Sequence, residues 1–434
     1  MLFRQFVDDD LGCASYLIGC EACGEAVVVD PPYAIEPLLE EAARRSVRIV
    51  RVIETHTHAD HLSGHGRLAL EHGSRVSVHP EAEAEYAHDP LSDGAEIRVG
   101  NVTLRCIHTP GHRPEHCCLA VIDHTRAEEP WLLLTGDSLF VGDTARPDLA
   151  VGGEEGAAGL YRSLQHLLEL PDGIEVYPGH VAGSLCGKGM SSKASTTLGF
   201  ERRFNPMLAF GDAASFIRAS ASLTTPKPPN IARIVELNRG PFVGSPPPVV
   251  SIAAPPTGAQ IVDVRPTAEY LAGHREAALS VPIDGGSFAT KAGYLLDPES
   301  SPLAVAAGDP GQAARAVRGL RSVGFLEIAG WLDGAGDVVM RTTSVHELDG
   351  IGATAQLVDV RESDEWESGH HPVALHIPYH QAAARAAELD PSRSVVTVCE
   401  TGARAVVAAS VLERLGFDTR PIASGGMANW HPGG

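Results

Sequence analysis

The sequence predicts an α/β protein of about three domains. Its 434 residues exceed what one ordinary hydrophobic core holds, because domains of about 150 residues are typical. Short apolar stretches with strand character alternate along the chain with helical stretches, and small or polar residues follow many of these strands directly. A segment that begins at Ile261 recurs at Leu357, so two of the domains should be copies of each other.

The composition limits the partners that the protein can have. Its formal charge is −21, from 55 acidic and 34 basic residues, which disfavours nucleic acids and anionic membrane surfaces and favours small solutes. No apolar run approaches the ~20 residues that span a bilayer, and residues 1–6 are soon followed by three aspartates rather than a hydrophobic signal core. We therefore expect a cytoplasmic protein.

Eight cysteines stand at irregular spacing, which does not fit a secreted disulfide framework. In a reducing compartment, thiols more often serve catalysis or packing. Cys20 and Cys23 form a CxxC pair at the turn of a hairpin predicted for residues 14–30. Because neither a second pair nor a βαβ context accompanies them, we do not expect a structural zinc or a redox role there.

Predicted helices and strands of the first half lead up to a histidine-rich loop. A helix is predicted for 34–45, and Pro37 is tolerated because it lies in the first turn. The alternating stretch 47–53 predicts a half-buried strand. Further strands are predicted around 75–79, 97–99, 102–107, 118–122, 131–134 and 174–176.

Side chains able to bind a metal follow four of the predicted strands. The loop 55–61, Thr-His-Thr-His-Ala-Asp-His, comes directly after strand 47–53, where α/β folds place chemistry. A Pro-Gly-His, a Thr-Gly-Asp and a second Pro-Gly-His follow later strands, and one of these alone would indicate only a turn. Together they give seven candidate ligands at four strand ends: His56, His58, Asp60, His61, His112, Asp137 and His180.

This order of motifs resembles the metallo-β-lactamase superfamily over about residues 1–240. The resemblance implies an αββα sandwich with metals between the sheet edges. In relatives that hydrolyse thioesters, such as glyoxalase II, it implies two metals, one on His56, His58 and His112 and one on Asp60, His61 and His180, with Asp137 bridging. In relatives that oxidise persulfides, it implies one iron on His56, His112 and Asp137. The seven residues by themselves permit both.

Residues after the aspartate are candidates for substrate binding. The segment 140–149 is similar to that of persulfide dioxygenases and their rhodanese fusions, and its Arg146 either meets a substrate carboxylate or phosphate or is an ordinary surface arginine. Basic residues farther on favour an anionic thiol carrier. The other candidates are Tyr177, Cys186, Lys188, Arg202 and Arg203. Cys186 either takes part in sulfur transfer or is a buried, inert thiol.

A proline-rich linker separates this half from a duplicated one. It runs from Lys227 to Pro248 and holds one short helix, predicted for 231–237. Beyond it, an apolar strand ending in Asp-Val-Arg, an acidic-aromatic helix and a Gly-His occur twice, 96 residues apart. Each copy resembles the rhodanese fold, a parallel doubly wound α/β module. The resemblance implies an inactive copy at 249–345 and a catalytic copy at 346–434.

The second copy has a cysteine where chemistry is expected. Cys399 follows a predicted buried strand over 395–398 and precedes a helix predicted for 406–415. Successive backbone N–H groups can converge on its sulfur, and the helix N-terminus adds positive potential, so we expect an ionised, nucleophilic thiol. The residues of this cradle are Glu400, Thr401, Gly402 and Ala403. Arg404 adds a full positive charge at its end.

The first copy has no thiol in the matching stretch. Aligning Gly311 with Gly402 places Gly308 where Cys399 stands in the second copy. This copy should therefore be inactive and structural. The plainer alternative for Cys399 is a core cysteine at a strand end.

The order of the three domains resembles the bacterial persulfide dioxygenase–sulfurtransferase fusions. The resemblance implies one Fe(II) on His56, His112 and Asp137, because two histidines and a carboxylate leave about three coordination positions open. The residues His58, Asp60, His61 and His180 would orient ligands and water. The implied partners are a low-molecular-weight thiol persulfide, O₂, and sulfite or thiosulfate, with Cys399 passing sulfur to a thiol or to sulfite.

Two other functions stay open. A dinuclear zinc hydrolase of thioesters would use the same seven residues and a bridging hydroxide. A sulfur carrier or redox sensor would act through Cys399 with a degenerate metal domain, which the intact ligand set disfavours. The sequence does not identify the thiol that carries the persulfide. We expect a homo-oligomer, by default a dimer.

Overall fold

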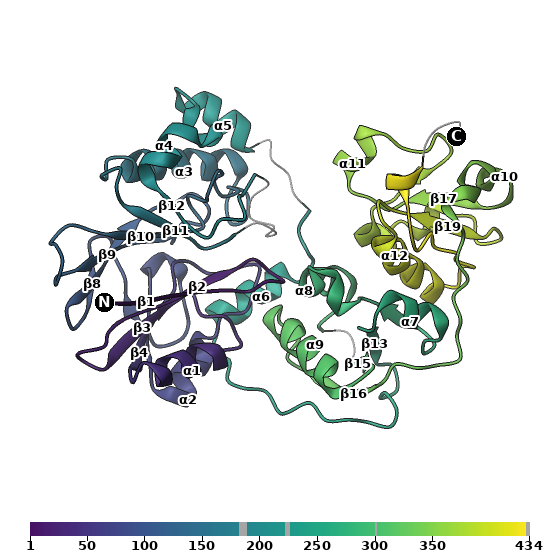
Figure 1. Cartoon of the computed structure of the whole chain (residues 1–434), viewed down its shortest axis with the longest axis horizontal. Helices are drawn as coiled ribbons and strands as arrows, with labels where there is room; N and C mark the ends of the chain where they lie inside the picture. Colours follow the sequence, from purple (N-terminus) through teal and green to yellow (C-terminus); the bar gives the residue numbers. More distant parts are fainter. Residues whose placement is uncertain (182–188, 222–225, 300–301, 431–434) are drawn as a thin grey trace. The chain divides into compact units, whose positions relative to one another are not determined.

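The computed structural model of the chain describes residues 1–181, 189–221, 226–299 and 302–430 (Figure 1). Its contacts divide it into two units, Met1–Ser245 with Arg321–Gly324, and Pro246–Leu320 with Phe325–Gly434. The finer division at 1–240, 249–345 and 346–434 remains our proposal. Within the described ranges, no helix has the length and apolar character needed to cross a bilayer.

A six-stranded sheet with the order β1-β2-β3-β4-β5-β6 forms one half of the first unit. Its strands are β1 (Leu2–Val7), β2 (Ala14–Cys20), β3 (Glu25–Val29), β4 (Arg48–Ile53), β5 (Arg75–Val78) and β6 (Asp89–Pro90). The first three pair antiparallel, and the rest add in parallel. The hairpin predicted for 14–30 is confirmed as β2 and β3. The sequence analysis missed β1, because its apolar residues do not alternate strictly with polar ones.

A second six-stranded sheet has the order β12-β11-β10-β9-β8-β7. Its strands are β7 (Glu96–Val99), β8 (Val102–His108), β9 (Cys117–Asp123), β10 (Leu132–Gly136), β11 (Glu175–Pro178) and β12 (Thr196–Thr197). Strand β10 lies parallel to β11, and β8 runs in the same direction because both β8 and β10 are antiparallel to β9. The carboxyl ends of β8, β10 and β11 therefore meet at one edge of the sheet.

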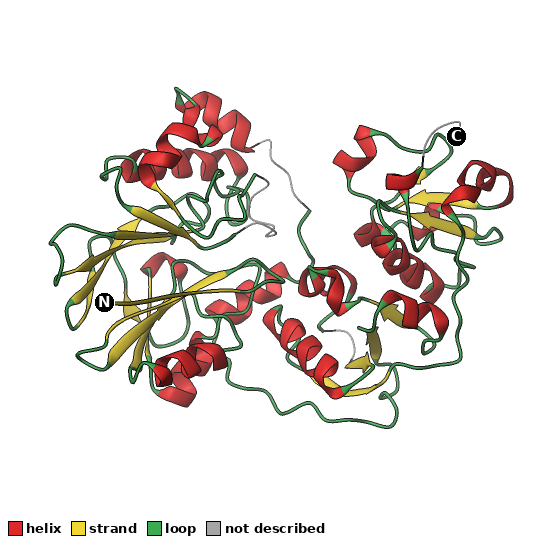
Figure 2. Cartoon of the chain, viewed as in Figure 1, coloured by secondary structure: helices red, strands yellow, loops and turns green. Residues whose placement is uncertain are grey.

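The two sheets pack face to face and helices cover their outer faces, giving the predicted αββα sandwich (Figure 2). The helices are α1 (Glu36–Arg44), α2 (His65–His72), α3 (Gly153–Leu167), α4 (Leu198–Phe204), α5 (Ala213–Ala221) and α6 (Ile231–Arg239). Alternate residues of β2 divide between the layers: Tyr16 and Ile18 enter the core between the sheets, whereas Leu17 packs under α1 and α2. Because both faces of β2 are covered, the whole strand is buried.

The second unit contains two smaller parallel sheets, with the orders β14-β13-β15-β16 and β18-β17-β19. Their strands are β13 (Gln260–Asp263), β14 (Ala278–Ser280), β15 (Leu303–Ala307), β16 (Ile328–Asp333), β17 (Gln356–Asp359), β18 (Leu375–His376) and β19 (Val395–Val398). The helices are α7 (Thr267–Ala272), α8 (Phe288–Leu295), α9 (Pro310–Ser322), α10 (Ile351–Thr354), α11 (Ser363–Ser368) and α12 (Ala403–Arg414).

The sequence repeat is also a structural repeat. In the first copy, Arg265 bonds to Asp263 at 2.6 Å and donates to the carbonyl oxygen of Gly273 at 2.9 Å. In the second copy, Arg361 makes the same two contacts 96 residues later, with Asp359 and Gly369, both at 2.7 Å. The buried Asp-Val-Arg motif thus serves in both copies to tie the end of the central strand to the helix that follows it.

Candidate metal centre and cysteine loop

Three of the predicted metal ligands converge at the edge of the sandwich. His56 lies in the loop after β4, His112 in the loop after β8, and Asp137 directly after β10. Each side chain is about 1% exposed, and one donor atom from each lies within 4.8 Å of the others. His112 Nε2 is 3.6 Å from Asp137 Oδ2. We call these three residues the triad.

The triad holds donor atoms that are buried but not used within the protein. Among the described residues, His56 Nε2 and Asp137 Oδ2 have no hydrogen-bond partner. The other ring nitrogens are taken: His56 Nδ1 lies 2.9 Å from Thr55 Oγ1, and His112 Nδ1 lies 3.0 Å from the carbonyl oxygen of Arg146. A carbonyl only accepts, so His112 keeps its proton on Nδ1 and its lone pair on Nε2. Buried, unpartnered nitrogen and oxygen donors in this arrangement fit a metal ion.

Neighbouring groups fix the orientation of the triad. Thr55 Oγ1 donates to Asp30 Oδ2 at 2.8 Å, and therefore accepts from His56 Nδ1. His180 Nδ1 donates to Asp137 Oδ1 at 2.7 Å, which leaves Oδ2 of that carboxylate for a metal. Burial alone would raise the pKa of Asp137, but His180 and its hydrogen bond hold that pKa below its usual range. Asp137 is therefore ionised.

His58 does not join the triad in this structure. Its Nε2 lies 3.2 Å from Asp30 Oδ1 and 3.2 Å from Glu54 Oε2. Burial would lower the pKa of His58, as would the nearby His61. The two carboxylates overcome both effects and raise the pKa of His58 to about 9. In this structure His58 therefore faces two carboxylates, and neither of its ring nitrogens makes a hydrogen bond.

Asp60, His61 and His180 form a second cluster, and a cysteine that the sequence analysis missed lies among them. Cys13 Sγ is 3.3 Å from Asp60 Oδ2, 3.4 Å from His61 Nδ1 and 3.2 Å from His180 Nε2. An antiparallel backbone bridge between Cys13 and His180 fixes this approach. The loop before β2 gave no motif that pointed to it.

Two further residues around the triad were also missed. His116 accepts a hydrogen bond from the backbone N–H of Asp137 at 2.9 Å, and burial lowers its pKa to about 3. Asp30, which directly follows β3, accepts a hydrogen bond from the Thr55 hydroxyl and faces His58. The position of Asp30 directly after an apolar strand was the available signal, the same one that identified Asp137.

Arg146 is buried and paired within its own loop. Its guanidinium donates to both oxygens of Asp148, at 2.6 and 2.8 Å, and Lys227 Nζ lies 3.2 Å from the same carboxylate. The Arg146 backbone carbonyl orients His112, so the residue touches the triad through its main chain. A contact of its guanidinium with substrate stays a prediction.

The carboxylate of Asp148 should make stability depend on acid pH. Burial would raise its pKa, but Arg146 and Lys227 lower it to about 2. A depressed pKa stabilises the fold above the unfolded value near 4, and this contribution of about 1–2 kcal/mol is lost as pH falls towards 2. Urea unfolding of metal-free protein should therefore show Asp148→Asn less stable than wild type at pH 6, with the gap closing at low pH. A gap that does not change with pH would contradict this assignment.

The other predicted substrate residues lie in local contacts. Tyr177 donates to Glu175 at 2.9 Å, and burial raises the pKa of Tyr177 to about 12. Arg202 donates to the carbonyl oxygen of Leu168 at 2.6 Å, and the Arg203 guanidinium lies 5.2 Å from the ring centre of Phe204. None of these recorded contacts within the described part of the chain involves the triad. Cys186 and Lys188 lie outside the described residues.

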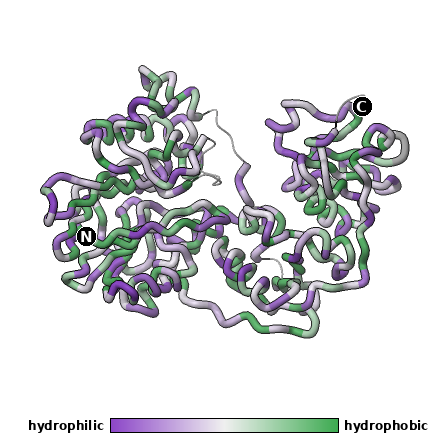
Figure 3. Tube along the Cα trace, in the orientation of Figure 1, coloured by the Kyte–Doolittle hydropathy of each residue, from purple (hydrophilic) through white to green (hydrophobic). Residues whose placement is uncertain are grey.

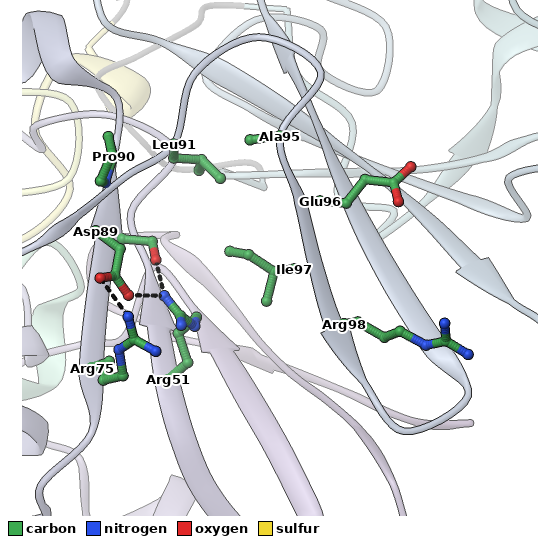
Figure 4. Close-up of a pocket in the computed structure, with 10 residues that line it drawn as sticks. Arg51, Arg75, Asp89, Pro90, Leu91, Ala95, Glu96, Ile97 and Arg98 are labelled. Atoms are coloured by element: carbon green, nitrogen blue, oxygen red, sulfur yellow. Dashed lines mark hydrogen bonds and ion pairs between the residues drawn. The ribbon is translucent and has the colours of Figure 1, made fainter.

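A polar pocket of ≈ 360 Å³ opens elsewhere in the first unit, between β4–β6 and β7 (Figure 4). Arg51 and Arg75 both bond to Asp89, at 2.5 and 2.6 Å, and Arg98 projects away from them. Because Asp89 already neutralises part of this charge, the pocket by itself identifies no ligand.

The predicted nucleophile of the second unit lies at the end of β19. Cys399 is about 1% exposed, and its Sγ accepts a hydrogen bond from the backbone N–H of Gly402 at 3.1 Å. Helix α12 begins at the next residue, Ala403, so its N-terminus lies against the sulfur. Thr401 is exposed. The loop thus supplies one backbone donor, the Gly402 N–H, to the thiol, and the larger cradle over 400–403 stays a prediction.

Two ion pairs flank this loop. Arg404 makes a bidentate contact with Glu365 at 2.5 and 2.6 Å, and this pair raises the pKa of Arg404, as does the nearby Cys399. Glu400 lies 3.2 Å from Arg361. Arg404 and Arg361 are therefore each paired with a glutamate next to the Cys399 loop.

In the first copy, strand register corrects the alignment made from sequence. Asp263 pairs with Ala306 as Asp359 pairs with Val398, so Ala307, not Gly308, occupies the place of Cys399. The alignment on glycines failed because helix α9 begins earlier in the loop than α12 does. The Gly308 N–H is taken by Gln312 Oε1 at 2.8 Å. The absence of a thiol at this position is unaffected by the correction.

Gly402 should not tolerate a side chain. Its φ is +110°, and a Cβ there would lie 2.2 Å from the carbonyl oxygen of Ala423. We expect Gly402→Ala to destabilise this unit by about 3 kcal/mol or more. Gly416 is the matched control, because its φ of +92° is also positive but nothing lies within 4 Å of its Cβ position, so Gly416→Ala should cost only about 1 kcal/mol. Hydrogen exchange of β19 and α12 amides in urea measures the difference, and equal losses would contradict the clash.

Comparison with known proteins assigns two regions of the chain to families. Residues 8–180 match the metallo-beta-lactamase superfamily, and residues 344–432 match the rhodanese-like domain. A crystal structure of a metallo-beta-lactamase from Staphylococcus aureus superposes with a TM-score of 0.71 at 31% identity, covering 77% of this chain and 99% of that chain. The predicted fold class is confirmed.

Curated relatives include two kinds of enzyme. The human mitochondrial persulfide dioxygenase ETHE1 is 28% identical over 240 residues, which is 55% of this chain and 87% of that protein. A hydroxyacylglutathione hydrolase from Polaromonas sp. is 36% identical over 170 residues, which is 38% of this chain and 61% of that protein. Sequence identity to these relatives does not distinguish persulfide oxidation from thioester hydrolysis. The arrangement of the candidate metal ligands is relevant to both activities.

Proposed function

Because the chain belongs to the metallo-β-lactamase superfamily and ends in a rhodanese-like domain, we propose that it oxidises a low-molecular-weight persulfide and transfers sulfane sulfur. The first reaction is R–S–SH + O₂ + H₂O giving R–SH and sulfite with release of two protons. The second moves a sulfur atom through Cys399. A persulfide dioxygenase among the relatives supports this substrate class.

The observation that carries the proposal is the triad without His58. Donor atoms of two histidines and one carboxylate converge, whereas His58 lies outside this group with its Nε2 3.2 Å from Asp30 and from Glu54. His56, His112 and Asp137 would hold one Fe(II) with about three coordination positions open, and the iron would supply the electrons for the reaction with O₂. In a dinuclear zinc site of the glyoxalase II type, His58 would be required as a ligand.

The surrounding residues fix the tautomers and the orientation of the triad side chains. The Asp30–Thr55 pair fixes the tautomer of His56, and the Arg146 carbonyl fixes that of His112. His180 occupies one oxygen of Asp137, so that only the other faces the metal position. The burial of all three ligands keeps bulk water away from the reacting sulfur.

In the second reaction, Cys399 acts as the nucleophile. Its thiolate attacks the outer sulfur of a persulfide or of thiosulfate, forming Cys399–S–SH and releasing R–SH or sulfite. A thiol or sulfite then takes this sulfur in the reverse attack. The Gly402 N–H and the N-terminus of α12 stabilise the thiolate before attack and the persulfide after it.

A thioester hydrolase is the second candidate. It is favoured by the cluster of Asp60, His61 and His180, which retains the residues of a second metal position, and by the hydroxyacylglutathione hydrolases among the relatives. A bridging hydroxide between two zinc ions would be its nucleophile.

Reaction stoichiometry separates the two candidates. With glutathione persulfide, the purified protein should consume one O₂ for each sulfite plus thiosulfate formed, and a glutathione thioester should remain intact. Rapid hydrolysis of the thioester without O₂ uptake from the persulfide would favour the hydrolase instead. Cytoplasmic placement and a homo-oligomeric state remain expectations from sequence.

A further inference from the structure

The CxxC pair of the first unit is arranged as a dithiol. Cys20 ends β2 and Cys23 lies in the turn before β3. Their Sγ atoms are 3.1 Å apart and share a hydrogen bond. Cys20 is 5% exposed, whereas Cys23 is exposed to solvent. One sulfur is thus open to a reagent and the other is held directly behind it.

The backbone brings the two residues within disulfide range. The Cys23 N–H donates to the Cys20 carbonyl oxygen at 3.0 Å, which is the bond of a β-turn. In such a turn the first and fourth Cα atoms lie less than ~7 Å apart, and disulfides join Cα atoms at about 4.4–6.8 Å. Closing the bond to about 2.05 Å requires the sulfurs to approach by roughly 1 Å. A side-chain rotation in an exposed turn supplies such a movement.

The turn between β7 and β8 packs against both sulfurs. Gly100 lies between β7 and β8, and a Cβ at this position would stand 2.4 Å from Cys23 Sγ and 2.6 Å from Cys20 Sγ. Its φ of +57° also favours glycine. The absence of a side chain leaves the two thiols in contact with each other and with the backbone of the opposite sheet.

The pair shares protons unequally. The backbone N–H of Asn101 lowers the pKa of Cys20, and the hydrogen bond to Cys20 raises the pKa of Cys23. In the structure the Cys20 thiol donates its hydrogen bond to Cys23 Sγ at 3.1 Å. A negative charge formed on the exposed Cys23 sulfur is therefore stabilised by Cys20.

Basic side chains stand beside the dithiol on an otherwise acidic protein. Arg98 Nε donates to the Gly100 carbonyl oxygen at 3.1 Å, and Figure 4 shows its guanidinium extending away from the Arg51–Asp89–Arg75 cluster. Arg45 lies 3.8 Å from Glu21, which is inside the CxxC turn. Because Arg45 also bonds to Glu41 at 3.0 Å, Arg98 is the cation here that favours the approach of an anionic thiol derivative.

Contrary to the expectation from sequence, we propose that Cys20 and Cys23 form a redox-active site that reduces low-molecular-weight persulfides to a thiol and sulfide. Cys23 attacks the outer sulfur of R–S–SH, forming Cys23–S–SH and releasing R–SH. Cys20 then attacks the Cys23 sulfur of this group, forming the Cys20–Cys23 disulfide and releasing H₂S. The sum is R–S–SH plus two thiols giving R–SH, H₂S and one disulfide, and two external thiols regenerate the pair by exchange.

This site takes the substrate class of the proposed function but uses neither the triad nor Cys399. The test therefore uses full-length Cys399→Ser protein, freed of metal and kept under nitrogen, so that neither O₂ chemistry nor rhodanese transfer contributes. The probe is glutathione persulfide. Released sulfide is measured against a buffer blank, and peptide mass spectrometry locates the modified cysteines. Failure of the oxidation reaction or of Cys399 transfer leaves both readouts intact.

We expect about one sulfide per chain and a peptide with Cys20 joined to Cys23. Cys20→Ser should release no sulfide and should trap one added sulfur atom on Cys23, because the resolving thiol is missing. Cys23→Ser should release none and leave Cys20 unmodified, because the remaining thiol is buried. The proposal would be overturned if Cys20 and Cys23 both stay reduced in protein with an unchanged CxxC turn. It would also be overturned if a sulfur atom is trapped on Cys20 in the Cys23→Ser variant.

Discussion

Replacing His112 with alanine is expected to remove iron from the protein and to lower O₂ consumption with glutathione persulfide more than ~100-fold. Changes to groups that only orient metal ligands cost 10–100-fold, so the loss of a ligand should exceed this. His112 supplies a buried nitrogen to the triad, and its other ring nitrogen is fixed by a backbone carbonyl. Iron content per chain and oxygen-electrode traces measure the effect.

His58→Gln is the matched comparison for His112→Ala. His58 faces Asp30 and Glu54, so its loss should lower stability through the uncompensated carboxylates but should leave an iron stoichiometry near that of wild type. Sulfur transfer by Cys399 should persist in both variants. Equal loss of metal from the two would contradict the separation of His58 from the triad and favour a dinuclear site.

Replacing Cys399 with serine is expected to abolish sulfur transfer between thiosulfate and a thiol, by at least ~1000-fold, while O₂ uptake with a supplied persulfide continues. Serine cannot hold a sulfur atom as a persulfide, and removal of an attacking nucleophile is among the most damaging changes to an enzyme. The hydroxyl fits the same space under Gly402, so the loop should keep its structure. Sulfite released from thiosulfate in the presence of the thiol, measured in parallel with oxygen traces, provides the measurement.

Cys106→Ser serves as the control for Cys399→Ser, because Cys106 is a buried thiol in the sheet core and lies in neither site. It should retain both activities. Loss of O₂ uptake in Cys399→Ser would overturn the division of labour between the two domains.

The metal triad could be predicted from sequence because each ligand follows a strand and a small residue. Strand ends are marked locally by glycine and proline, and parallel strands bring such ends to one edge whatever the details of packing. The same logic located Cys399, since a buried strand, a cysteine and a helix start are contiguous in the chain. These features depend on short-range signals.

The role of His58 could not be read from sequence, because it depends on which strands pair. Asp30 reaches His58 only since β3 and β4 lie in parallel register, which places their carboxyl ends together. Cys13 likewise meets His180 through a bridge between segments 167 residues apart. Long-range pairing of this kind has no local signature.

Other errors have local causes. Helix α3 was not predicted, because its sequence holds three glycines, which are poor helix formers. The place of Ala307 was mistaken for that of Gly308, since loops of different length were aligned on their glycines. Asp148 follows Arg146 by two residues in the sequence, but only a substrate contact or an ordinary surface arginine was considered for Arg146.

Stepwise loading of metal-free protein with Fe(II) tests the single-iron triad most directly. O₂ uptake with glutathione persulfide is predicted to rise with added iron and to stop rising near one equivalent per chain, and zinc alone should give no uptake. Uptake that requires two equivalents of metal, or zinc-loaded protein that hydrolyses a glutathione thioester while iron-loaded protein consumes no O₂, would contradict it.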